Sequence, residues 1–207
     1  MGTKGIQTRQ QIINKSLQLF SVKGYFNTSI CDILEATQLT KGGLYGHFQS
    51  KEAIWNAVYE EAVSIWKGIV FKDVRKTADP LKRIEKTIEN ALKNYLGADV
   101  FQGGCFFANM LVELSGQSAP MSKKVLQGFT GFSRLFRSCL EEADKKGLVK
   151  KELNFKEIAD FIVIAINGAV TLYSAERNPD IWKQTISQLN FYISQLKIKK
   201  EAKGDKI

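Results

Sequence analysis

The chain of 207 residues has few of the residue types that build metal, disulfide or catalytic sites. A single histidine leaves no partner for a His-based metal site or a catalytic dyad. The three cysteines, Cys31, Cys105 and Cys139, are odd in number and scattered, which argues against a disulfide framework. We therefore expect no metal or other cofactor, and no enzyme built on these residues.

Long hydrophobic runs are also missing. No apolar stretch follows a basic start at the amino terminus, so the sequence carries no secretory signal. The longest apolar run, within 161–173, is interrupted by Asn167 and Thr171 and is too short to span a bilayer. We expect a soluble, cytoplasmic protein without a membrane partner.

Acidic residues are outnumbered by basic ones. The formal net charge of +9 favours a polyanionic partner, although charge alone does not separate DNA from RNA or an anionic membrane. Part of the charge lies in the tail, where five lysines from Lys197 to Lys206 face only Glu201 and Asp205. We interpret residues 199–207 as a basic, solubilising end.

Strand signals are almost absent, whereas helix boundaries are frequent. Helix starts are predicted at Thr8 with Gln11, Ser50, Asp79-Pro80, Ala119-Pro120, Asn154 and Asn178-Pro179. The spacing predicts one helix from Pro80 to about Gly97 and a long helix from about Ser50 to Lys72. The sequence therefore predicts an all-α fold of about nine helices, with a small domain over 1–52 and a larger one over 53–198.

Residues 26–52 predict two short crossed helices joined by a turn. Ile30, Ile33 and Leu34 give the first helix one apolar face, and Thr28 or Ser29 can cap it. Thr40 can cap the second helix, in which Leu44 and Phe48 lie on one side. One anchored helix beside one that exposes polar side chains suits insertion into a major groove of DNA.

This segment resembles the helix-turn-helix signature of TetR-family transcriptional regulators. The matching residues are Asp32, Ile33, Leu39, Thr40, Lys41, Gly42, Leu44, Tyr45, Phe48, Ser50, Lys51 and Glu52, after an amphipathic helix with Ile13, Leu17 and Phe20 and the pair Gly24-Tyr25. Gln38 stands where the family has a turn glycine, which predicts a left-handed non-glycine residue. Gly43 replaces a common Thr or Ser and removes one possible DNA contact.

The resemblance and the exposed positions together predict the DNA contacts. They are Thr28, Ser29, Thr40, Lys41, Gly42, Tyr45, His47 and Lys51. Lysines would bind phosphates, Tyr45 would contact phosphate, sugar or a thymine methyl, and Gly42 would admit close approach of the backbone. In the alternative interpretation, Tyr45 and His47 only pack the small domain.

A second informative stretch, residues 102–116, resembles a Gly-Cys-x-x-x-Asn-x-x-x-Glu pattern of one TetR branch. Cys105, Asn109 and Glu113 would stack on one helix face. Together with the aromatic stripe of the following long helix they predict an apolar effector pocket, although an ordinary core fits the same pattern. The predicted lining is Cys105, Phe106, Asn109, Met110, Glu113, Phe129, Phe132 and Phe136, with Gly128 and Gly131 leaving room.

Cys105 suggests an alternative function for the protein. At a helix start its thiol pKa would be lowered by the helix dipole, which favours an electrophile-sensing or redox-sensing repressor. An inert buried cysteine is the other interpretation.

The last two predicted helices suggest an interface between two copies of the chain. Residues 158–173 are apolar nearly all round, and the final helix repeats apolar residues at spacings of four and three. The predicted interface is Ile162, Ile166, Trp182, Ile186, Leu189, Ile193 and Leu196. Two core helices of a monomer are the alternative.

The resemblance implies a homodimeric repressor that binds a palindromic double-stranded operator. A small apolar or aromatic effector would release it from DNA. Thiol sensing through Cys105 is the alternative, and an enzyme or a membrane-surface module is a remote one.

Overall fold

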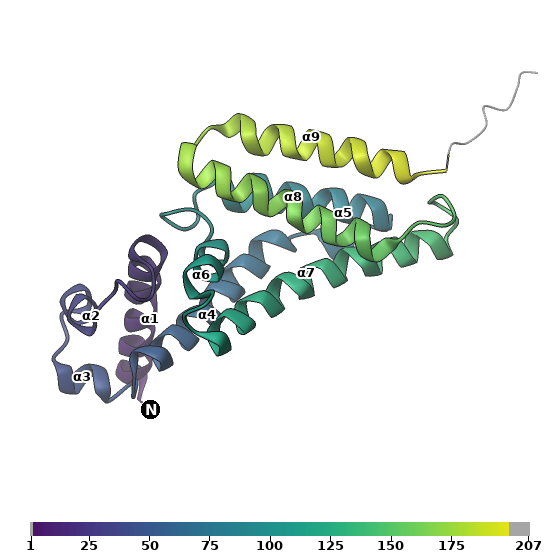
Figure 1. The fold of residues 1–207 in the computed structure, drawn as a ribbon. Coiled ribbons are helices and arrows are strands. Elements are labelled where there is room, and N and C mark those ends of the chain that lie inside the picture. Colours follow the sequence, from purple (N-terminus) through teal and green to yellow (C-terminus); the bar gives the residue numbers. More distant parts are fainter. Residues whose placement is uncertain (1, 199–207) are drawn as a thin grey trace, which may run out of the picture.

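The computed structural model describes residues 2–198, so the basic tail predicted over 199–207 lies outside the described residues. Within them the chain is all-α, as predicted from the sequence, and it contains nine α-helices (Figure 1). Their bounds are α1 Thr3–Lys23, α2 Ile30–Thr37, α3 Lys41–Tyr45, α4 Lys51–Val70, α5 Pro80–Glu89, α6 Phe106–Leu114, α7 Ala119–Lys145, α8 Phe155–Glu176 and α9 Pro179–Leu196. A 3-10 turn, η1, covers Val74–Lys76, and a π-helix, η2, covers Asn90–Leu96.

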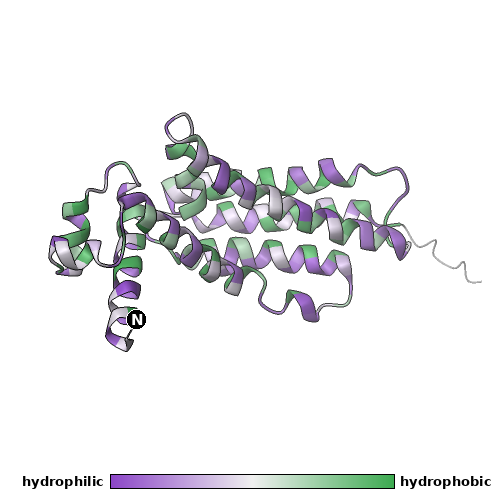
Figure 2. Ribbon diagram, turned by 90° about the horizontal axis from the view of Figure 1, so that it is seen from below, coloured by the Kyte–Doolittle hydropathy of each residue, from purple (hydrophilic) through white to green (hydrophobic). Residues whose placement is uncertain are grey.

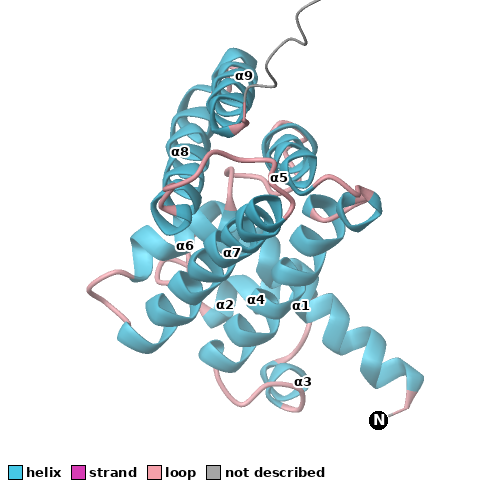
Figure 3. Ribbon diagram, turned by 90° about the vertical axis from the view of Figure 1, so that its right-hand side faces the viewer, coloured by secondary structure: helices cyan, strands magenta, loops and turns pink. Residues whose placement is uncertain are grey.

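Helices α1, α2 and α3 form a small unit at one end of the molecule (Figures 1 and 3). Its core is made by Ile13 and Phe20 of α1, Ile33 of α2, and Leu44 and Phe48 in and after α3. Helix α1 begins at Thr3, so the helix start predicted at Thr8 is wrong. The Thr8 hydroxyl donates to the Lys4 carbonyl within the helix instead of capping it.

Helix α4 leaves the small unit and enters the larger one. Its buried residues include Trp55, Val58 and Tyr59, which pack with α1 at one end and with the larger domain at the other. Apolar and polar residues alternate along the helices of the larger unit (Figure 2). Their apolar faces meet in a core that is continuous with that of the small unit.

The helix predicted from Pro80 to Gly97 changes type along its length. Asp79 caps α5 as predicted, and its carboxylate accepts hydrogen bonds from the backbone amides of Leu81 and Lys82 at 2.8 and 3.3 Å. From Asn90 the chain winds as a π-helix up to Gly97. Periodicity in the sequence does not separate a π-turn from an α-turn, and π-turns are rare.

Helix α8 is longer than the apolar run seen in the sequence. It spans 22 residues, and it is the one described helix long and apolar enough to cross a membrane by length and composition. The expectation that this segment is too short is therefore wrong. One side of the helix is nevertheless packed into the domain, with Ile162, Ile166 and Val170 buried. Phe161, Ile164 and Leu172 on its other side are exposed.

Candidate DNA-binding and effector sites

The two short helices are fixed by side-chain caps. Ser29 caps α2 in a capping box with Asp32, and Thr40 caps α3 by accepting a hydrogen bond from the Gly43 amide at 3.1 Å. Hydrogen bonds from Lys23 and Ser29 hold the pKa of Asp32 well below its usual range. Gln38 ends α2 in the left-handed conformation, at φ 56° and ψ 32°, as its position in the turn predicts. The turn therefore sets the angle between α2 and α3.

Helix α3 presents one exposed face. Lys41, Gly42 and Tyr45 are exposed, whereas Leu44 is buried beneath them. A Cβ built on Gly42 would have no atom within 4 Å. His47, just beyond the helix, is half-buried, and its Nδ1 atom is buried without a hydrogen-bond partner among residues 2–198. The face can meet another surface through Lys41, Gly42 and Tyr45.

Two residues that were predicted to contact DNA instead form hydrogen bonds within the protein. Thr28 is fully buried, and its hydroxyl donates to the Gly24 carbonyl at 2.6 Å. The Lys51 ammonium donates to the carbonyls of Tyr25 and Thr28, both at 2.9 Å, and lies 4.3 Å from the centre of the Tyr25 ring. Burial lowers the pKa of Lys51. The sequence shows a lysine at a helix start but not that the preceding loop folds back over it.

Glu113 joins the larger unit to the small one. Its carboxylate accepts hydrogen bonds from the backbone amides of Tyr25 and Phe26 at 2.8 and 2.7 Å. A Cβ on Gly24, which has a φ of 85°, would lie 2.6 Å from both carboxylate oxygens, so only glycine fits there. Glu113 and Lys51 thus hold opposite backbone groups of the loop between α1 and α2, and we call this arrangement the loop latch.

The larger unit contains a half-open cavity of 520 Å³. It lies between α4 and α7 and is closed by η2, the start of α6, and α8. Seven aromatic residues line it, namely Tyr59, Trp66, Phe71, Tyr95, Phe107, Phe129 and Phe132. Trp66 forms the centre of this cluster, with its ring 5.0 Å from that of Phe132 and 6.2 Å from that of Phe107. The cavity suits a flat, apolar molecule.

Lys124 of α7 joins the cavity rim to α4. Its ammonium lies 2.8 Å from a carboxylate oxygen of Glu60 and 3.1 Å from the side-chain oxygen of Asn56. The Tyr59 hydroxyl donates to the Lys124 carbonyl at 3.2 Å. A molecule that wedges between α4 and α7 must strain these contacts.

Three of the eight residues predicted to bind an effector line this cavity: Cys105, Phe129 and Phe132. Both glycines expected to leave room, Gly128 and Gly131, also line it. Phe106, Met110 and Phe136 are instead fully buried in the core and do not line the cavity. Asn109 donates to the Gly103 carbonyl at 2.9 Å, and Glu113 belongs to the loop latch.

Helix α4 and Phe107 also line the cavity, which was not predicted from the sequence. Tyr59, Val63 and Trp66 follow one another at spacings of four and three, which is a sign of one helix face. That pattern was available in the sequence, but it does not show whether such a face packs tightly or borders a cavity.

Cys105 does not have the environment expected of a reactive thiol. It is buried, and its sulfur lies 3.6 Å from the hydroxyl of Tyr95, which donates to it. Burial raises the pKa of the Cys105 thiol, and this effect is larger than the lowering of the pKa by the hydrogen bonds that the sulfur accepts. The expected lowering of this pKa by the helix dipole is therefore wrong. Cys31 is the exposed cysteine.

Five of the seven residues predicted for an interface between two copies face the interior of a single chain. Ile162, Ile166, Leu189, Ile193 and Leu196 are buried within a single chain, because α8 and α9 pack against each other and against α5, η2 and α7. Trp182 and Ile186 are half-buried beside α5. The exposed apolar residues are Phe161, Ile164 and Leu172 of α8 and Phe191 of α9. Apolar spacing alone cannot tell an internal seam from an external one.

Comparisons with known proteins agree with this architecture. Residues 12–58 match the model for bacterial regulatory proteins of the tetR family, and residues 80–189 match that for the tetracyclin repressor-like C-terminal domain. The chain is 31% identical over 180 residues to the HTH-type transcriptional repressor DhaR of Mycobacterium sp. (strain GP1), covering 82% of this chain and 84% of the relative. It is 25% identical over 174 residues to the repressor ComR of Escherichia coli (strain K12), covering 81% and 80%.

Solved structures show the same fold. A TetR transcriptional regulator from Chloroflexus aurantiacus J-10-FL superposes with a TM-score of 0.87 at 25% identity, covering 95% of this chain and 98% of that one. A TetR-family regulator from Cytophaga hutchinsonii gives 0.85 at 24% identity, covering 97% and 100%. These similar proteins are regulators rather than enzymes, which rules out the enzymatic alternative. The chain belongs to the TetR family of helix-turn-helix transcriptional regulators.

Proposed function

We propose that this regulator is a homodimeric repressor released from a palindromic operator by a small apolar or aromatic effector, and that it acts in the cytoplasm. The observation that carries the proposal is the chain of contacts from the aromatic cavity through α6 to the loop latch. Cys105 and Phe107 line the cavity at the start of α6, and Glu113 holds the small unit near its end.

The exposed face of α3 would enter the major groove of DNA. Lys41 would bind phosphate, Tyr45 would contact the backbone or a base edge, and Gly42 would admit the DNA backbone closely. Thr40, which is exposed, would add a hydroxyl contact, whereas the hydroxyl of the exposed Ser29 already donates to Asp32 at 2.6 Å. Lys51 has another role, because its ammonium holds the loop that carries Thr28. The related CifR protein, 14% identical, has been solved with a 26 bp double-strand operator DNA.

The effector would bind between α4 and α7. Its apolar body would pack on Trp66, Phe107 and Phe132, and its arrival would strain the contacts of Lys124 with Glu60 and Asn56. An effector lowers DNA affinity only by binding one arrangement of the two units more tightly than the other. Helix α6, a rod of about 13 Å at 1.5 Å per residue, would carry the movement to Glu113.

Thiol sensing is a weaker alternative. The thiolate is the reactive form of cysteine, and burial of Cys105 disfavours it. Cys31 is exposed, but it lies on α2, away from the cavity residues. We therefore favour non-covalent binding in the aromatic cavity.

Two chains would pair through the exposed apolar side of α8 and α9. Phe161, Ile164, Leu172 and Phe191 would leave water there. A dimer places two α3 helices at a fixed separation, which a palindromic site about 34 Å between half-site centres, or a multiple, would match. This surface replaces the set of buried residues predicted from the sequence.

Selection of DNA tests the proposal without knowledge of the effector. The full-length protein should enrich inverted repeats from a pool of random 30-bp duplexes, because two linked domains gain from effective concentration. A Lys41→Ala, Tyr45→Ala variant serves as the control and should enrich nothing. Enrichment of single, unrepeated half-sites would contradict the dimer, and absence of any enrichment would contradict operator binding.

A further inference from the structure

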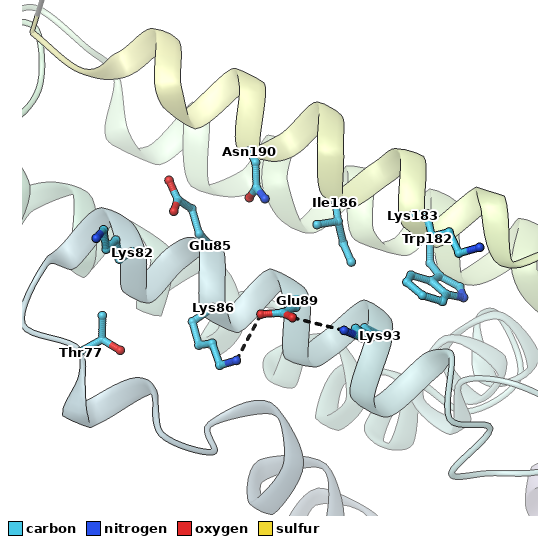
Figure 4. A pocket seen from close by; sticks show the side chains of 10 residues that line it. All are labelled: Thr77, Lys82, Glu85, Lys86, Glu89, Lys93, Trp182, Lys183, Ile186 and Asn190. Atoms are coloured by element: carbon cyan, nitrogen blue, oxygen red, sulfur yellow. Dashed lines mark hydrogen bonds and ion pairs between the residues drawn. The ribbon is translucent and has the colours of Figure 1, made fainter.

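A second hollow lies outside the effector cavity. It is an open groove of 590 Å³ between α5–η2 and α9, and it shares no lining residue with the cavity (Figure 4). Its walls are Thr77, Lys82, Glu85, Lys86, Glu89 and Lys93 on one side, and Trp182, Lys183, Ile186 and Asn190 on the other. The regulator described above does not need this groove for DNA or for the effector.

The groove carries more positive than negative charge. Four lysines line it against two glutamates. Glu89 forms ion pairs with two lysines, at 3.2 Å from the Lys86 ammonium and 3.7 Å from the Lys93 ammonium. The Lys183 ammonium lies 3.5 Å from a carboxylate oxygen of Asp180 and 5.8 Å from the centre of the Trp182 ring. Because each lysine ammonium has three donors, these lysines can also bind an anion in the groove.

The floor of the groove is apolar at one end and lacks a hydrogen-bond donor at the other. The Trp182 indole packs on Gly97, where a Cβ would lie 3.0 Å from the ring, and Ile186 follows it one turn later along α9. Asn190 comes next on the same face. Its side-chain oxygen is buried and has no donor within the described part of the chain. Because this oxygen has almost no accessible surface, the acceptor that a ligand would meet at this end is Glu85, one carboxylate oxygen of which lies 3.3 Å from the Lys197 ammonium.

The order of these groups along the groove indicates which chemical groups a ligand would need. Figure 4 shows Lys93 and Lys183 near Trp182 at one end, and Asn190 near Glu85 at the other. An anionic group fits the lysine end, an aromatic ring fits Trp182 and Ile186, and a hydroxyl or amine fits the carboxylate of Glu85. We propose that this groove is a second ligand site for aromatic acids that carry a hydrogen-bond donor at the end opposite the acid.

The position of the groove gives the site a route to the effector cavity. Lys93 lines the groove from η2, whereas Ala91 and Tyr95 of the same π-helix line the effector cavity. A ligand in one hollow therefore packs against the same segment as a ligand in the other.

Indole N–H resonances of the full-length protein test the site directly. Three tryptophans give three signals, and loss of one signal in Trp182→Phe identifies that of Trp182. The probe is 6-hydroxy-2-naphthoate, compared with 2-naphthoate, which lacks the donor, and 2-naphthol, which lacks the acid. We expect the hydroxy acid to shift the Trp182 signal saturably and to bind more tightly than either comparator.

Matched variants separate this site from the cavity. Lys183→Glu should weaken the effect of the hydroxy acid on Trp182 by about tenfold, whereas Lys151→Glu, an exposed lysine outside the groove, should leave it unchanged. Glu85→Leu should abolish the preference for the hydroxy acid over 2-naphthoate. The proposal is overturned if only the signal of Trp66, in the cavity, moves, or if Lys183→Glu and Lys151→Glu behave alike.

Discussion

A carboxylate oxygen of Glu113 lies 2.8 Å from the backbone nitrogen of Tyr25, although 88 residues separate the two along the chain. The contact joins a helix that borders the aromatic cavity to the loop before α2 and α3. A carboxylate that receives two backbone amides makes strong, charge-assisted hydrogen bonds. We therefore regard Glu113 as a positioning residue for the DNA-binding unit.

The loop latch can be tested through Gly24. Gly24→Ala would place a methyl group 2.6 Å from both Glu113 oxygens, on a residue with φ 85°. In urea denaturation we expect Gly24→Ala to lose more free energy of unfolding than backbone strain of about 1–3 kcal/mol accounts for, because the methyl group also displaces the Glu113 carboxylate. The control is Gly116→Ala, whose φ is 76° but whose Cβ would meet nothing within 4 Å. Equal losses in both variants would show that backbone strain alone acts, without the latch.

Gly42→Ala separates folding from DNA binding. Alanine at this open helical position should raise stability by roughly 0.5–1 kcal/mol. The same methyl group should weaken operator binding at least tenfold, because it stands where the DNA backbone would approach. Thermal unfolding and fluorescence anisotropy with labelled operator measure the two effects. Unchanged operator affinity would remove Gly42 from the interface.

Charges on the exposed apolar face should separate the dimer. Ile164→Glu with Leu172→Glu should yield a folded monomer in sedimentation, with operator affinity strongly reduced. Ile193→Glu is the contrasting change, since that side chain is fully buried in one chain and a buried charge should unfold it. A double variant that stays dimeric would place the interface elsewhere.

Thiol reactivity should rank Cys31 far above the other two cysteines. Cys31 is exposed, whereas burial raises the pKa values of both Cys105 and Cys139. Titration with a chromogenic disulfide at pH 8 should show one fast thiol, absent in Cys31→Ser, and two slow ones. A fast phase lost in Cys105→Ser would instead revive the thiol-sensing alternative.

The contact between α5 and α7 should make stability fall in acid. Hydrogen bonds from Arg83 and Lys146 lower the pKa of Glu142 from 4.5 to about 2. A lowered pKa means that the stabilisation is present above the unfolded pKa and is lost as pH falls from about 4.5 towards about 2. Glu142→Gln should flatten the pH dependence of unfolding in that window. An identical slope in wild type and variant would contradict this assignment.

Helix starts and types were predictable from the sequence where local chemistry fixes them. The caps at Ser29, Thr40 and Asp79 bind their own helix starts, and Gln38 takes the left-handed turn that its position requires. Thr8 shows the limit of that approach, since a hydroxyl inside a helix donates to the preceding turn just as readily.

The site was harder to predict because it depends on which helix faces meet. Ile193 and Phe191, two residues apart, lie on opposite sides of α9, and the spacing does not say which side faces the domain; the structure buries Ile193 and leaves Phe191 62% exposed. Likewise Glu113 shares a helix face with Cys105 but reaches the loop at Tyr25 instead of the cavity. Such outcomes follow from packing between distant segments, which spacing in the sequence does not encode.

The central claim is that an effector in the aromatic cavity acts on DNA binding through Glu113. Its most direct test is the ratio of operator Kd values with and without the compound that native mass spectrometry finds bound to the purified protein. In the wild type we expect the compound to weaken operator binding at least tenfold. In Glu113→Ala the compound should still bind the cavity, but the ratio should fall close to one. A full response in Glu113→Ala would contradict the account.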